Sequence, residues 1–193
     1  MQRVTLLEGR AIPIGKNLSF HPIIDLSKQW VGIRSDDDEA KAFDKLEAAI
    51  KRLFPEEYGE VLPFVATLMG MKLSGSYAQR TKGIEGQALE KLILKSLRDL
   101  LVRAAERTPL IIVMEDLHWA DTSSIELMES LFRLAETQRI LFINLFRPGF
   151  QETGERILKT LGERLPVYHL EMVLEPLDER YVKTLIGNML TIW

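Results

Sequence analysis

The sequence predicts an α/β domain with a mostly parallel β-sheet. Two continuous apolar runs, Leu110–Met114 and Ile140–Leu145, have the length and composition of buried strands. Segments with apolar residues at helical spacing lie before, between and after these runs. Strands that alternate with helices form parallel sheets, because each helix returns the chain to the start of the next strand.

The N-terminal segment is expected to begin with a further strand. Val4–Leu7 is a short apolar run, and we expect Gly9 to end the strand. A loop should follow as far as Phe20. Pro22 suits the first turn of a helix that continues to Trp30.

Helices dominate the region between this strand and Leu110. The acidic segment 35–38 favours a helix start, because carboxylates stabilise the positive N-terminal end of a helix. We expect a solvated cap here rather than a metal site, and Pro55 should end the helix. Two further helices are expected over Val61–Met71 and Leu89–Ala104, on either side of the polar, flexible stretch Lys72–Gly86.

The region after Leu110 repeats the alternation of strand and helix. Asp121–Ser124 should cap a helix, with Ser123 and Glu126 as a capping box. The remaining expected elements are a helix around Glu152–Leu161, a strand at Val167–Leu170 and a helix that Asp178 caps and that reaches Leu190.

The composition limits the classes of function. The chain has 193 residues, of which 46% are hydrophobic, and this suffices for the core of one domain. A net charge of −3 does not favour direct nucleic-acid binding through a broad basic face, and the absence of cysteine excludes disulfides and thiolate metal sites. No apolar run approaches the ~18 residues that span a membrane, and the N-terminus lacks the apolar core of a signal peptide. We therefore expect a soluble, cytoplasmic protein.

The stretch EGRAIPIGKNLSF, residues 8–20, raises the question of a phosphate-binding loop. Such a loop reads G-x-x-x-x-G-K-[S/T], and its backbone N–H groups surround the phosphates of ATP. Here five residues rather than four separate Gly9 from Gly15. Asn17 replaces the hydroxyl residue that binds Mg²⁺, and Pro13 removes an amide. We predict a surface loop instead, and no match to the pattern occurs anywhere in the sequence.

Two acidic residues, Glu115 and Asp116, directly follow the apolar run Leu110–Met114. Ligands of open α/β sheets bind at the carboxyl ends of the strands. Carboxylates at this edge suit Mg²⁺ that is held partly through water, as in phosphate chemistry. Acids at strand ends also occur in response-regulator receivers and in phosphatases, so the pair alone leaves the reaction class open.

The residues after the acidic pair narrow the choice. Glu115–Asp121 reads EDLHWAD and resembles the Walker B block of the STAND group of AAA+-like ATPases. Three further segments resemble the second-strand segment, the sensor strand and the start of the helical lid of that family: LEGRAIPIGKNLSFHPIIDL, ILFINLFRPG and LEPLDERYVKTLI. The modules in question are those found beside bacterial adenylate/guanylate cyclase, Ser/Thr kinase and LuxR-type regulatory domains. The likeness spans the chain from about Arg3 to Leu190.

This resemblance implies a P-loop NTPase-like three-layer sandwich with a mostly parallel sheet that lacks the first, central strand and the phosphate-loop helix. In the family the strand order is like 5-1-4-3-2, so Val167–Leu170 and Ile140–Leu145 would flank a gap. Residues 1–175 would form an incomplete ATPase core, and residues 176–193 would begin the helical lid.

The resemblance also assigns roles to residues, with ATP and Mg²⁺ as the implied cofactors. Glu115 would be the metal-side acid that holds Mg²⁺, and Asp116 would polarise the attacking water. Arg147 would be the sensor that contacts the γ-phosphate, although Leu145 stands where the family often has Thr or Ser. All three would bind the nucleotide, and Asp116 and Arg147 would be catalytic.

The neighbouring residues of the block receive weaker assignments. His118 either relays between Asp116 and a neighbouring element or is structural, and Trp119 is expected to pack. Asp121 is expected to cap the next helix. Two other histidines, His21 and His169, are expected to be structural or exposed.

The expected function is that of a fragment of a signal-transduction ATPase that binds and slowly hydrolyses ATP–Mg²⁺ as a conformational switch. Its partners would be the nucleotide and an attached output or sensor domain, with a nucleotide-dependent oligomer as a further expectation and no membrane or direct nucleic-acid partner. A phosphate loop supplies several charge-assisted hydrogen bonds of ~1.5–3 kcal/mol each. Without them the parent ATP hydrolase would be reduced to an inactive chain with millimolar or weaker affinity.

The alternative is a non-catalytic protein-interaction module on a degenerate ATPase fold. The missing phosphate loop favours this module, whereas the intact pair Glu115 and Asp116 favours the ATPase. A receiver that accepts a phosphoryl group on Asp116 is disfavoured, because the sequence lacks the further acid and the Lys that this chemistry needs.

Overall fold

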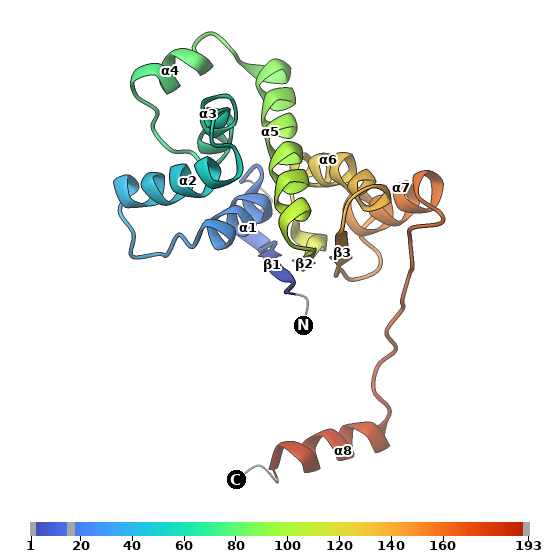
Figure 1. Ribbon diagram of the computed structural model, residues 1–193. Coiled ribbons are helices and arrows are strands. Elements are labelled where there is room, and N and C mark those ends of the chain that lie inside the picture. Colours follow the sequence, from blue (N-terminus) through green and yellow to red (C-terminus); the bar gives the residue numbers. More distant parts are fainter. Residues whose placement is uncertain (1–2, 15–17, 191–193) are drawn as a thin grey trace.

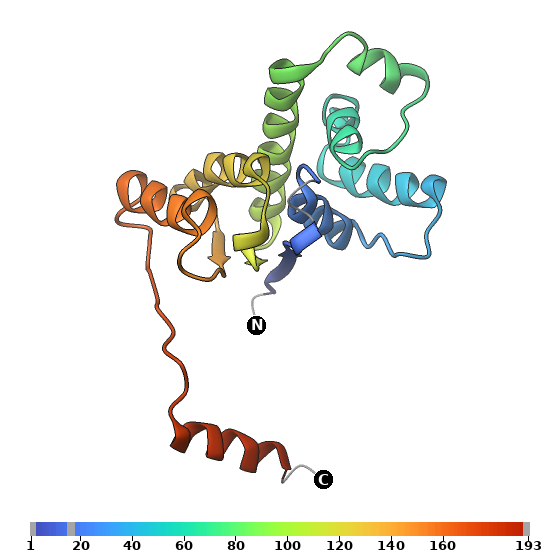
Figure 2. The same cartoon turned by 180° about the vertical axis from the view of Figure 1, so that it is seen from behind.

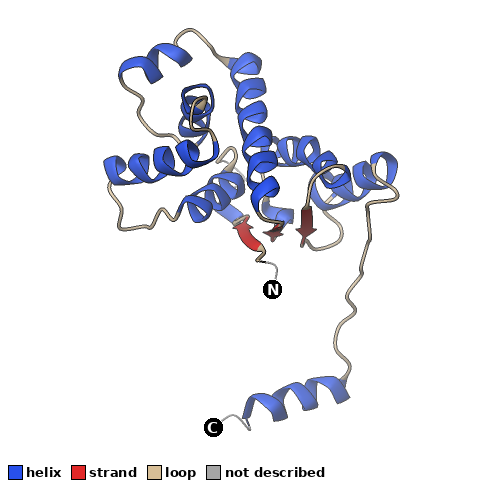
Figure 3. Ribbon diagram, viewed as in Figure 1, coloured by secondary structure: helices blue, strands red, loops and turns tan. Residues whose placement is uncertain are grey.

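A three-stranded parallel sheet lies beneath a layer of helices in the computed structural model, which describes residues 3–14 and 18–190 (Figure 1, Figure 3). The strands are β1 (Thr5–Arg10), β2 (Leu110–Glu115) and β3 (Ile140–Asn144), in the spatial order β1-β2-β3. Helices α1 (His21–Val31), α5 (Gly86–Arg107) and α6 (Thr122–Leu131) pack on one face of the sheet. The predicted α/β class with a parallel sheet is confirmed.

The two faces of this sheet differ in their cover. The covered face carries Leu7, Leu110, Ile112, Met114, Ile140 and Phe142, which contact the helices. The bare face carries Val4, Leu6, Ile111, Val113, Leu141 and Ile143, which alternate with the first set along the strands. Leu6 and Leu141 are 53% and 54% exposed. Of the three expected layers, the described residues therefore form the sheet and one helical layer.

Strand β1 does not end at Gly9, as the sequence suggested, but continues through it to Arg10. Gly9 lies where α1 crosses the strand, and a Cβ atom there would be 2.7 Å from the carbonyl oxygen of Pro22 and 3.0 Å from Sδ of Met114. The glycine therefore permits close helix–strand packing rather than a turn. The helix itself begins as predicted, with Pro22 in its first turn.

A second group of helices packs beside the sheet. Helices α2 (Glu39–Leu53) and α3 (Tyr58–Leu68) share a core with α5, and α4 (Gly75–Thr81) contacts α3. The polar stretch Lys72–Gly86 was expected to be irregular, so α4 is a correction. Arg80 on α4 pairs with Glu60 on α3, and the hydroxyl of Tyr77 donates to Glu47 on α2 at 2.6 Å.

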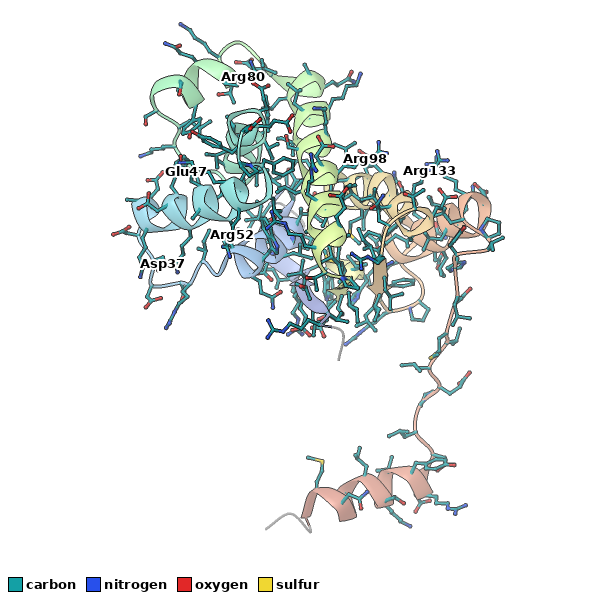
Figure 4. All side chains as sticks on the ribbon, viewed as in Figure 1. Asp37, Glu47, Arg52, Arg80, Arg98 and Arg133 are labelled. Atoms are coloured by element: carbon teal, nitrogen blue, oxygen red, sulfur yellow. The ribbon has the colours of Figure 1, made fainter. Side chains whose placement is uncertain are left out.

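The acidic segment before α2 is a cap, as predicted. The side chain of Asp38 accepts a hydrogen bond from the backbone N–H of Lys41 at 2.8 Å. Asp37, labelled in Figure 4, is ion-paired with Lys41 and Lys45 and accepts the backbone N–H of Arg34. Hydrogen bonds from the two lysines hold the pKa of Asp37 well below its ordinary value. These bonds tie the connection from α1 to the start of α2.

The C-terminal region departs most from expectation. Helix α7 (Arg156–Arg164) follows a short π-helical turn, Gln151–Glu155, and packs on α6. Val167–Leu170 is not a strand but part of an extended, exposed linker over residues 166–178, because no described strand lies beside it to accept its backbone hydrogen bonds. Helix α8 (Glu179–Leu190) stands apart at the end of that linker (Figure 1). Its N-terminus is capped by Asp178 as predicted, with the N–H of Tyr181 donating at 2.9 Å.

None of the helices in the described part of the chain combines the length and the apolar character needed to cross a membrane.

Candidate functional site

The two predicted acids stand at the carboxyl end of the central strand. Glu115 is the last residue of β2 and is exposed, and Asp116 follows it directly. The backbone N–H of Ala11 donates to the carbonyl oxygen of Glu115 at 3.0 Å, and this bond joins the ends of β1 and β2. Arg10 pairs in register with Glu115. Both acids thus lie at the edge where parallel sheets bind ligands.

Asp116 is held by an arginine from the neighbouring strand. Nε and Nη2 of Arg10 donate to Oδ2 of Asp116 at 2.9 and 2.8 Å. The hydrogen bond to Asp116 raises the pKa of the Arg10 guanidinium further above its ordinary value. The side chain of Arg10 is 63% exposed and that of Asp116 is 33% exposed. The ion pair therefore fixes the orientation of the carboxylate but adds little to the stability of the fold.

The backbone of Asp116 is also unusual. Its φ of 54° lies in the left-handed region, which aspartate tolerates better than most residues but which still costs free energy. Such a conformation persists where the surroundings fix it. Here the neighbouring Leu117 donates its N–H to the carbonyl oxygen of Leu145 at 3.0 Å, and Arg10 holds the side chain.

Arg10 is the site residue that sequence reasoning missed. Arg10 lies within the segment LEGRAIPIGKNLSFHPIIDL, but the family resemblance assigns no role to it. The signal that could have found it is topological. If Val4–Leu7 and Leu110–Met114 pair in parallel, Arg10, three residues after the first run, comes level with Glu115, which directly follows the second.

Arg147 lies on the loop that follows the next strand. The N–H of Leu145 donates to the carbonyl oxygen of Met114 at 2.9 Å, which joins this loop to the one that bears Asp116. Arg147 follows two residues later and is exposed. The structure therefore places Arg147 on a loop adjoining that of the acids, with its side chain open to solvent.

The aromatic residues of the block pack as a unit. His118 is 1% exposed, and its ring lies 4.9 Å from that of Trp119 and 5.0 Å from that of Phe150. Trp119 also meets Phe150 edge to face. The prediction that Trp119 packs is confirmed. His118 is enclosed by these rings, which favours the structural role over the relay.

Asp121 caps α6, as predicted. Its carboxylate accepts the backbone N–H of Ser124 at 2.9 Å and also the hydroxyl of Ser124. The expected capping box of Ser123 and Glu126 is therefore wrong, because Asp121 itself is the N-cap residue. Asp121 is buried in this role.

The stretch EGRAIPIGKNLSF begins inside β1, which ends at Arg10. Gly15, Lys16 and Asn17 lie outside the described residues, so the surface loop stays a prediction there. Gly9, the first glycine of the stretch, is inside a paired strand and packed against α1. It therefore cannot act as the first glycine of a phosphate cradle.

The residues at this edge fit a nucleotide-bound Mg²⁺ better than a metal held by protein alone. Among residues 3–14 and 18–190, no cluster of three or more His, Cys, Asp or Glu side chains could hold a metal ion. Mg²⁺ at phosphate sites commonly takes one or two carboxylates, with phosphate and water oxygens completing its shell. Glu115 is exposed and has room for this role, and Asp116 is fixed by Arg10 with one carboxylate oxygen left over.

Comparison with known proteins identifies the family. The model of the AAA ATPase domain matches residues 2–143, which include β1, β2, β3 through Ile143, and both acids. No curated protein matches the chain, and neither does any solved structure. The match covers most of the sequence and contains Arg10, Glu115 and Asp116. The chain belongs to the AAA ATPase domain family, whose members are nucleotide-binding ATPase modules.

Proposed function

We propose that the chain forms the acidic half of the ATP site in a signal-transduction ATPase of the STAND type. The observation that carries the proposal is the position of Glu115 and Asp116 at the carboxyl end of the central strand, inside the part matched by the AAA ATPase model. This is the edge at which open α/β sheets bind nucleotides.

In this proposal Glu115 holds Mg²⁺ and Asp116 polarises the water that attacks the γ-phosphate. The metal ion, when bound with ATP, neutralises charge on the phosphates. Arg147 contacts the γ-phosphate from the adjoining loop. Its exposure leaves the guanidinium available for an anion.

Arg10 is proposed to position Asp116. Both of its hydrogen bonds use Oδ2, so Oδ1 is the oxygen that can face a water molecule. The ion pair also fixes the carboxylate of a residue whose backbone is strained. A carboxylate engaged in this way suits the slow turnover expected of a conformational switch.

The phosphate cradle is proposed to come from a further strand beside β3. Strand β3 is at the edge of the sheet, with no partner on its outer side among the described residues. An open edge leaves backbone N–H and C=O groups unpaired unless another strand pairs with it. The 193-residue chain alone is expected to bind ATP at millimolar affinity or weaker, and residues 176–193 would begin a lid.

The wider role follows the family resemblance. The ATPase is proposed to pass its nucleotide state to an attached output or sensor domain in the cytoplasm. It is also proposed to form a nucleotide-dependent oligomer, which light scattering would measure. No membrane or nucleic-acid partner is proposed.

The roles of the acids can be tested in a form extended at its N-terminus by a strand and phosphate loop. Asp116→Asn should reduce ATP hydrolysis about 100-fold or more and leave ATP binding intact. The control is Glu8→Gln, because Glu8 is an acid on the same face of the sheet as Glu115 but outside the site. This change should leave ATP binding and hydrolysis unchanged. Equal hydrolysis by the Asp116→Asn variant and the parent would contradict the assignment.

The sensor can be tested in the same form. Arg147→Ala should weaken hydrolysis, whereas Arg133→Ala, a change of an exposed arginine after α6, should not. Equal effects of the two changes would remove Arg147 from the proposal.

The alternative function is a protein-interaction module, and the bare face of the sheet is the observation that favours it. ATP binding by neither the chain nor the extended form would support this alternative.

A further inference from the structure

We propose that Phe150 is a positioning residue, which holds the loop of Arg147 in a fixed place beside the loop of Asp116. Residues 145–150 are called the arginine loop here, and residues 116–119 the acid loop. Figure 2 shows the arginine loop as the orange connection from β3 to α7. The catalytic consequence rests on the function proposed for Arg147, whereas the fixed place of the loop rests on contacts alone.

The arginine loop is joined to the acid loop at its first residue. The backbone N–H of Leu145 donates to the carbonyl oxygen of Met114 at 2.9 Å, and the N–H of Leu117 donates to the carbonyl oxygen of Leu145 at 3.0 Å. These bonds extend the contact between the two chain segments beyond the last paired residues of β2 and β3. Both bonds use backbone atoms, so this first joint does not depend on the side chains of the loop.

A side chain makes the second joint, at the other end of the loop. The ring of Phe150 lies 5.0 Å from that of His118 and 5.8 Å from that of Trp119, both on the acid loop. Aromatic rings attract one another at such separations. His118 is 1% exposed, so the surface that Phe150 meets is itself fixed in the core.

The π-helical turn that follows the loop keeps Phe150 in place. The carbonyl oxygen of Phe150 accepts the N–H groups of Thr153 and Glu155, each at 3.3 Å. The ring of Phe146 lies against Gly154 in the same turn, where a Cβ atom would overlap the ring. Both phenylalanines of the arginine loop are therefore held by the turn.

Arg147 stands between the two joints. Its side chain is exposed, and two residues later Gly149 turns the backbone with a φ of 87°, which glycine adopts without strain. The place of the guanidinium therefore follows the backbone of the loop, whose ends are fixed at Leu145 and Phe150. Loss of the Phe150 ring would release one end and let Arg147 move relative to Asp116.

The position of the loop can be measured in the 193-residue chain without nucleotide. Because the chain contains no cysteine, spin labels can be attached at Arg147→Cys and at Lys95→Cys, an exposed position on α5. Electron–electron double resonance then gives the distribution of distances between the labels. Phe150→Ala should broaden that distribution about twofold or more, whereas Phe150→Tyr, which keeps the ring, should leave it narrow.

Phe43→Ala is the matched control. Phe43 on α2 is half-buried, as Phe150 is, and its ring lies 6.0 Å from that of Tyr77 on α4. The change removes the same atoms from the second group of helices. It should leave the distance distribution unchanged, which separates a general loosening of the fold from release of the arginine loop.

A double-mutant cycle in the form extended at its N-terminus tests the catalytic consequence. Phe150→Ala should lower kcat for ATP hydrolysis about tenfold or more while Arg147 is present, because a small displacement of a catalytic group is costly. In the Arg147→Ala background the same change should lower kcat less than about twofold. A loss of stability would act equally in both backgrounds.

Two results would overturn the proposal. An unchanged distance distribution in the Phe150→Ala variant would show that the ring does not hold the loop. Equal losses of kcat in the two backgrounds would show that Phe150 does not act through Arg147. Full hydrolysis by the Arg147→Ala variant would instead overturn the role proposed for Arg147, and the distance measurement would still decide the place of the loop.

Discussion

The two faces of the sheet are built from similar residues but have different surroundings. On β2, Ile112 is 4% exposed beneath the helices, whereas its neighbour Ile111 points to the bare face. A strand that is apolar on both sides is typical of a sheet covered on both sides. The difference teaches that the bare face is made to be covered, and that the described helices supply only half of the cover.

The largest expected effect compares these two neighbours directly. Ile112→Ala should lower the free energy of unfolding by about 2–4 kcal/mol, because it leaves a cavity in the packed core. Ile111→Ala removes the same atoms from the other face and should cost less than about 1 kcal/mol. Urea denaturation measures both, and equal losses would show that the bare face is as well packed as the covered one.

A second effect concerns the close contact of α1 with the covered face. Gly9→Ala should lower the free energy of unfolding by about 1–3 kcal/mol, because the new Cβ would meet the backbone of Pro22. The matched control is Gly162→Ala on α7, where nothing lies within 4 Å and alanine favours the helix. Thermal unfolding should move in opposite directions for the two variants, and a neutral Gly9→Ala would contradict the tight packing.

A third effect concerns the hydrogen bonds that join α6 to α7. Glu129 on α6 accepts hydrogen bonds from Arg156, at 2.7 Å from Nη2, and from Thr160. Burial favours its neutral form, but these bonds outweigh burial and lower the pKa of Glu129 below its ordinary value of 4.5. A lowered pKa stabilises the fold above pH 4.5, and this contribution is lost as the pH falls through the folded-state pKa.

Glu129→Gln should therefore destabilise the chain by about 1–3 kcal/mol at pH 7. The difference from the parent should shrink as the pH falls below 4.5. Unfolding curves at several pH values measure it, and a difference that grows in acid would contradict the sign.

The smallest expected effect on the free energy of unfolding comes from a change on the bare face. Leu6→Lys should change the free energy of unfolding by less than about 0.5 kcal/mol, because the side chain is largely exposed. It should nevertheless reduce the binding of a hydrophobic dye. A large loss of stability would indicate that Leu6 is covered in solution.

The sequence predicted the elements whose signals are local. The apolar runs predicted strands β2 and β3. Asp38 and Asp178 predicted the starts of α2 and α8, and Pro22 predicted the start of α1. These signals depend on residues within one or two turns of each other.

The elements that sequence reasoning missed depend on distant contacts. Gly9 was expected to end a strand because its packing against α1 is not visible in the local sequence. Helix α4 forms against α3 in a stretch of polar residues. Val167–Leu170 has the composition of a strand but lacks a neighbouring strand in the described residues.

The candidate site divides in the same way. Glu115, Asp116 and the cap Asp121 were recognised from one contiguous block. Arg10 is separated from Asp116 by most of the helical region and meets it only because β1 and β2 pair in parallel. The acids were therefore predictable from a motif in the sequence. Their partner Arg10 could be identified only once the pairing of β1 with β2 was known.

Calorimetric titration with ATP–Mg²⁺ tests the central claim most directly. The account predicts millimolar or weaker binding by the 193-residue chain, and micromolar binding by a form extended with a strand and phosphate loop. Micromolar binding by the 193-residue chain itself would contradict the claim that it holds only the acidic half of the site.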